Sequence, residues 1–506
     1  MRRQIFGLLA LSVLLLNGVS CQSATLEEKT QGTDDEAVTN TSVSEGELGW
    51  RDILPQSDYN GETFTVLVET NANVPIWERY WTAEEDSGDV LSSAVYNRNV
   101  TVSEHYNINL EYAMLDDTGN RLYNSIAADE YPYNLAVFHM AAASSFVMKS
   151  AFMNWLDIDG VDFSHPWWSV SNVEDLAYQN VLFTAIGDYA TSSLATTYCM
   201  FYNKNLAEDY QLGDIYAIVN EKKWTIDKLK ELTKDIYVDL NMDGKAGPED
   251  LYGFATSPAT AIIAYNWALG GQIYKNSGDG TLQKVFMNER TVNLYEKVYS
   301  LMHESNGSYS SYDYVSPTGD NYHNLGRGML VNRQAVFVNG KFDDALATFR
   351  NMEDDYGIIP YPMLDEAQGR YYTTTDAALE AMMIPINTPE EKLEMVAVLS
   401  EALCGESYET VTPAYYQSSL KDKAARDEIA YDMLDLIRDS RKFDFGYLYN
   451  FNITYCGYAS FMENLMNPRN PRNDFVSYYE EREKEIDSYF TDVFEFYEDY
   501  ILEFGD

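Results

Sequence analysis

The stretch TFTVLV at residues 63–68 sets the fold, because its side chains alternate in the period of two that a β-strand requires. Two further strands are predicted at 108–114, INLEYAM, and at 135–138, LAVF. Residues 90–102 and 122–126 lie between these strands and carry apolar side chains three or four positions apart, as in helices. Alternating strands and helices predict an α/β fold with a parallel sheet, whose ligands bind beyond the carboxyl ends of the strands.

A second α/β segment follows this first one. It begins near 181–186, continues through a strand at 198–202 and helices near 224–237 and 291–302, and shows no fixed internal repeat.

The last quarter of the chain is predicted to be helical. Thr388 is the expected N-cap of a helix that has Pro389 at its first position, Glu391 closing a capping box and Gly405 at its end. Two amphipathic helices follow, near 425–437 and 475–501.

Length and charge limit the classes of protein that this chain can represent. Its 506 residues exceed the roughly 250 to 300 residues that one core supports, so two lobes are expected. The 80 acidic residues against 35 basic ones give a net charge of −45, which repels nucleic acid and anionic lipid headgroups. The apolar fraction of 45% is ample for folded cores, so the charge is a property of the surface.

The N-terminus predicts export and lipidation. Arg2 and Arg3 precede the apolar run 5–16, which is too short to remain as a membrane span. Cys21 follows small residues in a lipobox-like context, so residues 1–21 are expected to be a lipoprotein signal peptide with Cys21 as the lipidated residue. The alternative is a plain signal peptide that happens to contain a cysteine.

Residues 22–49 are predicted to be a flexible acidic tether, because they carry seven carboxylates, one lysine and few apolar side chains. The body that follows has only Cys199, Cys404 and Cys456, so it is not a disulfide scaffold. An exported protein could hold one disulfide among these three, and the sequence does not choose the pair.

Several weak segments follow one another in a fixed order: VLFTAIGDY (181–189), TYCMFYNKNLAEDYQL (197–212), WTIDKLKELTKDI (224–236), DLNMDGKAGPEDLYGF (239–254), WALGGQIY (267–274), FVNGKFDDAL (337–346) and YGIIPYP (356–362). This order resembles the extracellular solute-binding proteins of family 1, the maltose-binding type, in their Gram-positive lipoprotein form. Together the segments span most of the chain from about residue 59 onward.

This resemblance implies a two-lobed fold of the periplasmic-binding-protein type (type II), with a ligand cleft between lobes joined by a hinge. By analogy the chain crosses between lobes near 187–196 and returns near 364–379. The implied parts are the first section of lobe 1 at 50–190, lobe 2 at 191–364, a return to lobe 1 at 365–405, and C-terminal helices packing on both lobes at 406–506.

The sharpest local motif is a calcium-type loop at 239–250. Asp239, Asn241, Asp243 and Asp250 supply side-chain oxygens at loop positions 1, 3, 5 and 12, and Lys245 supplies a backbone carbonyl. A structural Ca²⁺ is therefore predicted, with a metal-free polar loop between a helix and a strand as the alternative.

Sugar recognition needs flat apolar faces and planar polar groups, and the chain has 8 Trp and 41 Tyr. For each aromatic residue, packing in a lobe core is the competing interpretation. The predicted ligand-binding residues are Trp155, Trp167, Trp168, Asp188, Tyr189, Trp267, Asn339, Lys341 and Asp376.

Enzymatic motifs are weak in this sequence. The five histidines lack the HExxH spacing, and the chain has no Gly-x-Ser-x-Gly elbow, phosphate-cradling glycine loop or CxxC pair. Among so many acids, a carboxylate pair for glycoside cleavage is uninformative.

The resemblance therefore implies a non-enzymatic, substrate-binding lipoprotein of an ABC importer. It would capture a small solute, a mono- or oligosaccharide, as a monomer on the extracellular face of the cell membrane, and its partners would be permease subunits. The alternatives are a surface-anchored glycan hydrolase or lyase, and an interaction lipoprotein whose cleft holds no solute.

Overall fold

The computed structural model describes residues 49–504 apart from 71–74, 85–87, 170, 316–318, 320, 420–427 and 454–456. These residues form one compact unit. The predicted signal peptide, the lipidated Cys21, nearly all of the tether and Cys456 lie outside the described residues.

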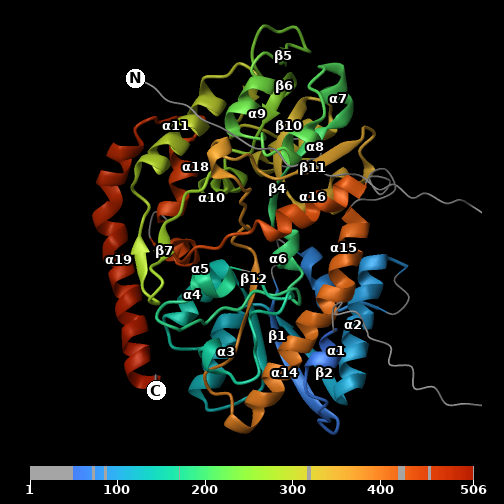
Figure 1. The fold of residues 1–506 in the computed structure, drawn as a ribbon, viewed down its shortest axis with the longest axis vertical. Coiled ribbons are helices and arrows are strands. Elements are labelled where there is room, and N and C mark those ends of the chain that lie inside the picture. The colour runs from blue at the N-terminus through green and yellow to red at the C-terminus, as the bar shows by residue number, and fades with distance from the viewer. Residues whose placement is uncertain are drawn as a thin grey trace, which may run out of the picture. The chain divides into compact units, whose positions relative to one another are not determined.

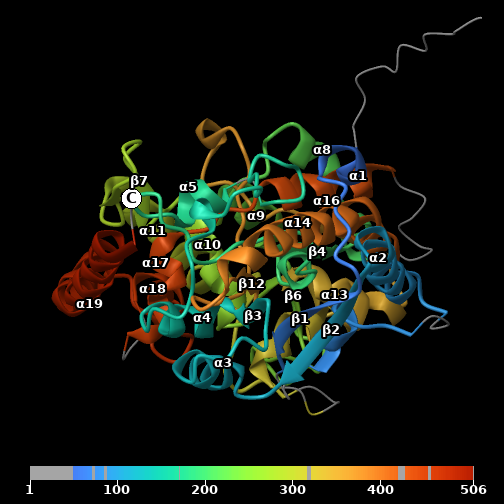
Figure 2. The same cartoon turned by 90° about the horizontal axis from the view of Figure 1, so that it is seen from below.

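The first sheet has the strand order β12-β3-β1-β2 (Figure 1). β1 (Glu62–Glu69) runs parallel to both β2 (Ile108–Leu115) and β3 (Leu135–His139), so the three predicted strands and their parallel pairing are confirmed. The two predicted connecting helices are also present, as α2 (Val90–Tyr106) and α3 (Thr118–Ala127). We call this sheet and its helices lobe 1, and Figure 2 shows α2, α3 and α14 around it.

The fourth strand of lobe 1, β12 (Glu380–Met383), is antiparallel to β3 and was not predicted. In sequence, β12 comes after all the strands of the second sheet. All four of its residues are buried, so the strand lacks the apolar and polar alternation by which strands are recognised.

The second sheet has the order β11-β4-β10-β6-β5 and forms lobe 2. Its strands are β4 (Tyr198–Asn203), β5 (Tyr237–Val238), β6 (Leu251–Ala255), β10 (Ala335–Lys341) and β11 (Tyr356–Ile359), and β9 (Ser308–Tyr309) pairs with β6. β10 is parallel to β6 and antiparallel to β4. Two α/β sheets in separate halves confirm the predicted two-lobed α/β fold.

Most of the remaining elements are helices. They are α1 (Trp50–Ile53), α4 (Met140–Val147), α5 (Asn172–Leu176), α6 (Ser192–Ala195), α7 (Lys204–Asp209), α8 (Ile215–Asn220), α9 (Ile226–Thr233), α10 (Tyr265–Ala268), α11 (Glu289–His303), α12 (Leu325–Val331), α13 (Phe342–Ala347), α14 (Glu390–Glu406), α15 (Thr412–Ser419), α16 (Glu428–Asp439), α17 (Phe445–Leu448), α18 (Phe461–Leu465) and α19 (Phe475–Phe504), with a hairpin of β7 (Tyr274–Asn276) and β8 (Leu282–Lys284).

Segments that run between the lobes pair with one another. Thr197, just before β4, forms an antiparallel bridge with Thr375, on the way from β11 back to β12. Thr373 pairs in parallel with Arg441, which follows α16. Short paired segments of this kind can act as a hinge, because a few backbone torsions there reorient whole lobes.

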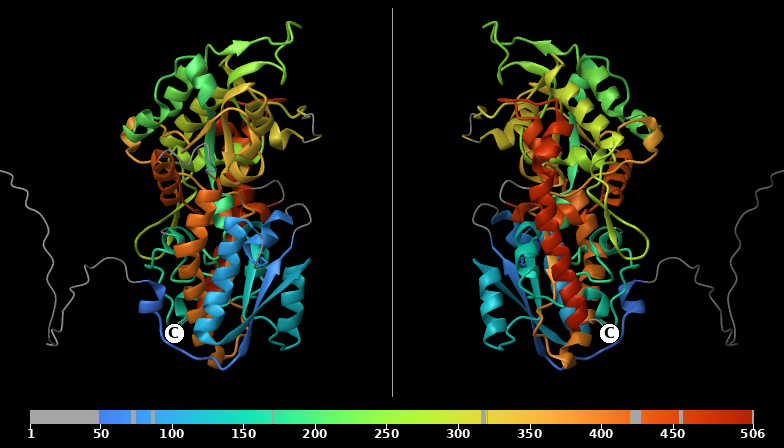
Figure 3. Two further views of the ribbon diagram at one scale, coloured as in Figure 1. Left: turned by 90° about the vertical axis from the view of Figure 1, so that its right-hand side faces the viewer. Right: turned by 90° about the vertical axis from the view of Figure 1, so that its left-hand side faces the viewer.

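The C-terminal helix α19 contacts both lobes along one side of the molecule (Figure 3). Near its start, Phe475 stacks on Tyr295 of lobe 2 with ring centroids 4.3 Å apart. Near its end, the Tyr500 hydroxyl accepts a hydrogen bond from the backbone N–H of Asn154, whose neighbour Trp155 packs against lobe 1. The aromatic face of this helix therefore holds the lobes together.

The predicted boundaries of α14 were wrong at both ends. Pro389 is the N-cap, and the Thr388 hydroxyl instead donates to the Pro385 carbonyl, so there is no capping box. The helix also continues through Gly405, where a Cβ would lie 2.6 Å from Cβ of Trp50. This glycine serves the close approach of α1 to α14 rather than helix termination.

Candidate functional site

Charged side chains from both lobes meet where three strands end. Glu69 and His139 close β1 and β3 of lobe 1, and Lys341 closes β10 of lobe 2. Lys341 Nζ lies 3.1 Å from Oδ2 of Asp376, which stands on the return segment between the lobes. We call Glu69, His139, Lys341 and Asp376 the strand-end cluster.

The electrostatics of the cluster favour a charged Lys341–Asp376 pair. Burial alone would raise the pKa of Asp376, but the Lys341 ammonium and the Ala378 N–H hold it below its usual value. Burial opposes the charge on Lys341, yet Asp376 and Asp344 raise its pKa. The side chains remain 26% and 16% exposed, so the pair is fixed but accessible to a small molecule.

On the lobe 1 side, Glu69 and His139 are held together. The Glu69 Oε2 accepts the backbone N–H of His139 at 3.0 Å and lies 3.8 Å from its Nδ1. Burial lowers the pKa of His139, against the opposing effect of Glu69 and Asp376. The imidazole is therefore biased toward its neutral form, which can both donate and accept hydrogen bonds.

A second set of charges joins the lobes beside the cluster. Arg79 NH2 lies 3.4 Å from Asp343 Oδ1, and the Tyr80 hydroxyl donates to the same oxygen at 3.1 Å. Arg79 and Tyr80 follow β1 of lobe 1, whereas Asp343 is on α13 of lobe 2. Sequence reasoning missed Glu69, His139, Arg79 and Asp343. The available signal was position for Glu69, His139 and Asp343, which lie at or within two residues of the carboxyl end of a strand. Arg79 lies farther along the chain from β1 and carried no such signal.

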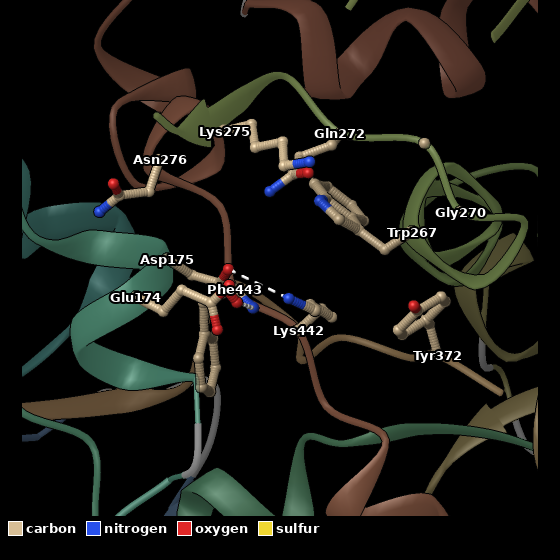
Figure 4. A pocket seen from close by; sticks show the side chains of 11 residues that line it. Glu174, Asp175, Trp267, Gly270, Gln272, Lys275, Asn276, Tyr372, Lys442 and Phe443 are labelled. Atoms are coloured by element: carbon tan, nitrogen blue, oxygen red, sulfur yellow. Dashed lines mark hydrogen bonds and ion pairs between the residues drawn. The ribbon is translucent and has the colours of Figure 1, made fainter. Parts of the chain in front are cut away.

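A separate cavity of about 240 Å³ lies between α5 of lobe 1 and the α10–β7 region of lobe 2 (Figure 4). We call it the Trp267 cavity. Its lining also includes Tyr372 from the return segment and residues 442–443. The other charged and aromatic side chains of the lining are Glu174, Asp175, Trp267, Lys275, Lys442 and Phe443.

Two buried carboxylates fix residues 442–444 to both lobes. Asp175 of lobe 1 accepts the Phe443 N–H at 3.0 Å and lies 3.4 Å from Lys442 Nζ. Asp444 accepts the Ile273 N–H of lobe 2 at 2.7 Å and the Trp267 indole N–H at 3.4 Å. Burial raises the pKa of Asp444 to about 7. The loop that leads into β7 lies close to the Asn266 carbonyl because Gly271 has no Cβ. A Cβ at this position would lie 2.5 Å from that carbonyl oxygen.

Three of the predicted ligand residues lie in the lobe 1 core. The Trp155 indole donates to the Met382 carbonyl at 3.1 Å. The indoles of Trp167 and Trp168 both donate to the fully buried carboxylate of Glu401. All three are at most 2% exposed, and none lines the Trp267 cavity.

Asp188 and Tyr189 are also buried, at the start of the first crossing. Asp188 pairs with Arg438 at 2.9 Å and accepts from the Thr412 hydroxyl, while the Tyr189 hydroxyl meets that of Tyr112 at 2.9 Å. These contacts brace the crossing.

The structure brings Lys341 and Asp376 together in the strand-end cluster. Asn339 lies two residues before Lys341 on β10, with its amide 3.5 Å from the Tyr265 hydroxyl. Trp267 lines the separate cavity.

The 239–250 loop is closed by its own hydrogen bonds. Asp239 accepts the N–H of Gly244 at 2.9 Å, and Asp243 accepts that of Lys245 at 2.8 Å. Asp250, which is buried, accepts from Leu240, Gly247 and Tyr237. Oδ1 of Asp239 is buried and takes no hydrogen bond from the described residues. Within the described part of the chain, however, no three His, Cys, Asp or Glu side chains are placed to hold a metal.

Cys199 and Cys404 are buried free thiols, so they form no disulfide with each other. Burial raises the pKa of both thiols. In the part of the chain that the structure describes, no helix is both long and apolar enough to cross a membrane.

No family model and no curated protein sequence matches the chain. Among solved structures it is similar to the sugar-binding protein MalE from the phytopathogen Xanthomonas citri, with a TM-score of 0.54, 12% identity, and coverage of 86% of this chain and 99% of that one. It is also similar to UspC from M. tuberculosis, with a TM-score of 0.51, 12% identity, and coverage of 82% and 97%. A third is UgpB from M. tuberculosis, solved in complex with glycerophosphocholine, with a TM-score of 0.51, 13% identity, and coverage of 79% and 96%. At these identities the likeness shows the fold alone, which the chain shares with these three proteins.

Proposed function

We propose that this chain is an extracellular solute-binding lipoprotein that captures a sugar between its lobes and delivers it to the permease of an ABC importer. The observation that carries the proposal is the strand-end cluster. There, charged groups of both lobes meet at the carboxyl ends of strands, where α/β sheets bind their ligands.

Capture would follow from contacts that only the closed arrangement can make. A ligand that touches Glu69 or His139 on one side and Lys341 on the other gains both sets of contacts only when the lobes are close. Such a ligand shifts the population of lobe arrangements toward the closed one. The paired segments at Thr197 and Thr375 would act as the hinge.

The chemistry of the cluster is suited to hydroxyl groups. Lys341 offers N–H donors and Asp376 offers acceptor oxygens 3.1 Å away, so neighbouring hydroxyls of one sugar could donate to one partner and accept from the other. The fold likeness to a sugar-binding MalE supports the same ligand class.

Lipidation at Cys21 and the acidic 22–49 segment would keep the monomeric body beside its membrane partner. The permease would then meet a tethered receptor repeatedly, without needing a high affinity for it. Calcium binding by the 239–250 loop remains a prediction, and its role would be to stiffen an edge of lobe 2.

The first experiment is a thermal-shift screen of the purified full chain against mono- and oligosaccharides. A ligand that binds only the folded state adds ~2.7 kcal/mol of stability at a hundredfold excess over its Kd. We expect at least one saccharide to raise the Tm, with no product formed on long incubation. Saccharide turnover would instead favour the surface glycan hydrolase. An absence of any saccharide response would overturn the ligand class.

A further inference from the structure

The Trp267 cavity is separate from the strand-end cluster, because the residues that line it include none of that cluster. Its walls come from α5, the α10–β7 region, Tyr372 of the return segment and residues 442–443, as Figure 4 shows. A volume of about 240 Å³ is below the roughly 300 to 1,000 Å³ of pockets for drug-sized ligands, so only a small molecule would fit.

The base of the cavity is rigid and partly apolar. Trp267 and Phe443 are both buried, and Asp444 holds the indole N–H of Trp267 and the backbone of Ile273. Asp175 accepts a hydrogen bond from the Phe443 N–H and forms an ion pair with Lys442. These pairs satisfy the buried polar groups, so a ligand need not compensate any of them.

Two charged side chains at the mouth of the cavity have no partner of this kind. Glu174 stands on α5 of lobe 1 and Lys275 on β7 of lobe 2, and both are exposed. Among the described residues, neither side chain forms a hydrogen bond or an ion pair. Figure 4 shows Glu174 beside Asp175 and Lys442, and Lys275 on the other side of the cavity with Gln272 and Trp267.

The balance of charge therefore differs between the two sides. On the α5 side the Asp175–Lys442 pair is neutral overall, which leaves the Glu174 carboxylate as an excess negative charge. On the β7 side Lys275 is the one charged side chain among the lining residues, next to the amide of Gln272. A ligand with a cationic and an anionic end can satisfy both sides at once, whereas a neutral sugar or a simple ion can satisfy at most one of them fully.

We propose that the Trp267 cavity binds a small zwitterion of amino-acid size, with its ammonium end toward Glu174 and its carboxylate end toward Lys275. The aliphatic or aromatic part of the ligand would lie against Trp267 and Phe443. This site is independent of the sugar function proposed for the strand-end cluster.

The test is calorimetric titration of the full chain with a panel of free L-amino acids, together with glycine betaine and uncharged monosaccharides as comparison probes. At least one zwitterion is expected to bind. Glu174→Gln and Lys275→Gln are each expected to weaken that binding about tenfold or more, the scale of one charged hydrogen bond. The double exchange E174K/K275E should restore part of the affinity, because the ligand can bind in the reverse direction.

Matched controls separate this site from the sugar site and from general charge effects. Lys484→Gln and Glu495→Gln change exposed charges on α19 and should leave zwitterion affinity unchanged. Asp376→Asn should also leave it unchanged, although that variant is expected to weaken sugar binding. Three results would overturn the inference: no zwitterion binds, its affinity survives both changes at the mouth, or an uncharged monosaccharide displaces it from the cavity.

Discussion

Glu401 and Asp376 are both carboxylates that gather donors, yet their surroundings differ in one decisive respect. Glu401 is fully buried, and its partners, the indoles of Trp167 and Trp168, the backbone of Asp162 and the His165 ring, come from one short stretch of lobe 1. Asp376 is partly exposed, and its main partner, Lys341, belongs to the other lobe.

The difference shows how to separate structural from functional polar groups. Donors within one lobe keep their positions whether the lobes are open or closed. They therefore stabilise the fold but do not respond to a ligand that closes the lobes. A pair that spans the lobe boundary depends on the arrangement of the lobes and can respond to a ligand. Residue type alone does not distinguish the two cases.

The largest expected effect is on the structural side of the comparison. Glu401→Gln places an amide N–H₂ among donors that need an acceptor, so we expect the free energy of unfolding to fall by about 3 kcal/mol. Chemical denaturation measures this loss. Glu485→Gln, an exposed change on α19, is the control and should change stability by less than about 0.5 kcal/mol. An equal effect of both variants would contradict the structural role of Glu401.

Asp376→Asn should show the opposite profile. It removes the charge facing Lys341, so the affinity for the saccharide found in the thermal screen should fall tenfold to a hundredfold, or ~1.4 to 2.7 kcal/mol. Stability should change by less than about 1 kcal/mol, because the pair is partly solvated. Calorimetry and denaturation of the same preparation give both numbers. Unchanged affinity would remove the strand-end cluster from the ligand site.

Glu380 is a third carboxylate to compare with Glu401 and Asp376. Its side chain is buried, and the groups that donate hydrogen bonds to it are neutral. Burial raises the pKa of Glu380 to about 8, and hydrogen bonds from Ser192 and Trp81 offset this only in part. Between pH 4.5 and about 8 the folded protein thus holds a proton that the unfolded chain has lost, so stability falls as pH rises. Glu380→Gln should remove this slope and gain about 1 to 2 kcal/mol relative to the parent between pH 5 and pH 8. Parallel stability profiles for the two proteins would contradict the assignment.

The smallest expected effect concerns the 239–250 loop, which lies apart from both carboxylate sites. If Ca²⁺ binds, adding it should raise the Tm of the parent by a few degrees, since binding to the folded state stabilises by mass action. Asp239→Ala should abolish that rise and leave sugar affinity unchanged. Removing Ca²⁺ with a chelator should return the parent to its starting Tm. A Tm rise that persists in the variant would place the ion elsewhere.

Sequence patterns predicted the architecture better than the site. The alternation at 63–68 and the helical spacing at 90–102 were sufficient for β1 and α2, because periodicity reports burial directly. The same logic failed at β12, where every residue is buried, and at Gly405, whose role depends on Trp50, far away in the chain.

Among the candidate site residues, Lys341 and Asp376 lie together at the lobe boundary, whereas three of the aromatic ones lie in the lobe 1 core. Lys341 ends strand β10 and meets Asp376, which stands on the return segment that the topology brings to the same place. Trp155, Trp167 and Trp168 were chosen for their flat faces, but tertiary partners such as Glu401 decide whether an indole faces a ligand or a core. Those partners are distant in sequence and leave no local pattern.

The late return of β12 to the first sheet bears on how the chain acquires its structure. β3 ends at His139, and its partner begins at Glu380, so all the strands of the lobe 2 sheet lie in the intervening chain. Lobe 2 takes its strands from one continuous stretch and can condense as soon as that stretch is available. The sheet of lobe 1 is complete only when β12 pairs with β3, which closes a much longer loop. Until then the edge of β3 is unpaired, and the long loop slows the formation of this lobe. Refolding should therefore proceed in two stages, and chaperone dependence should be concentrated in the first lobe to be synthesised.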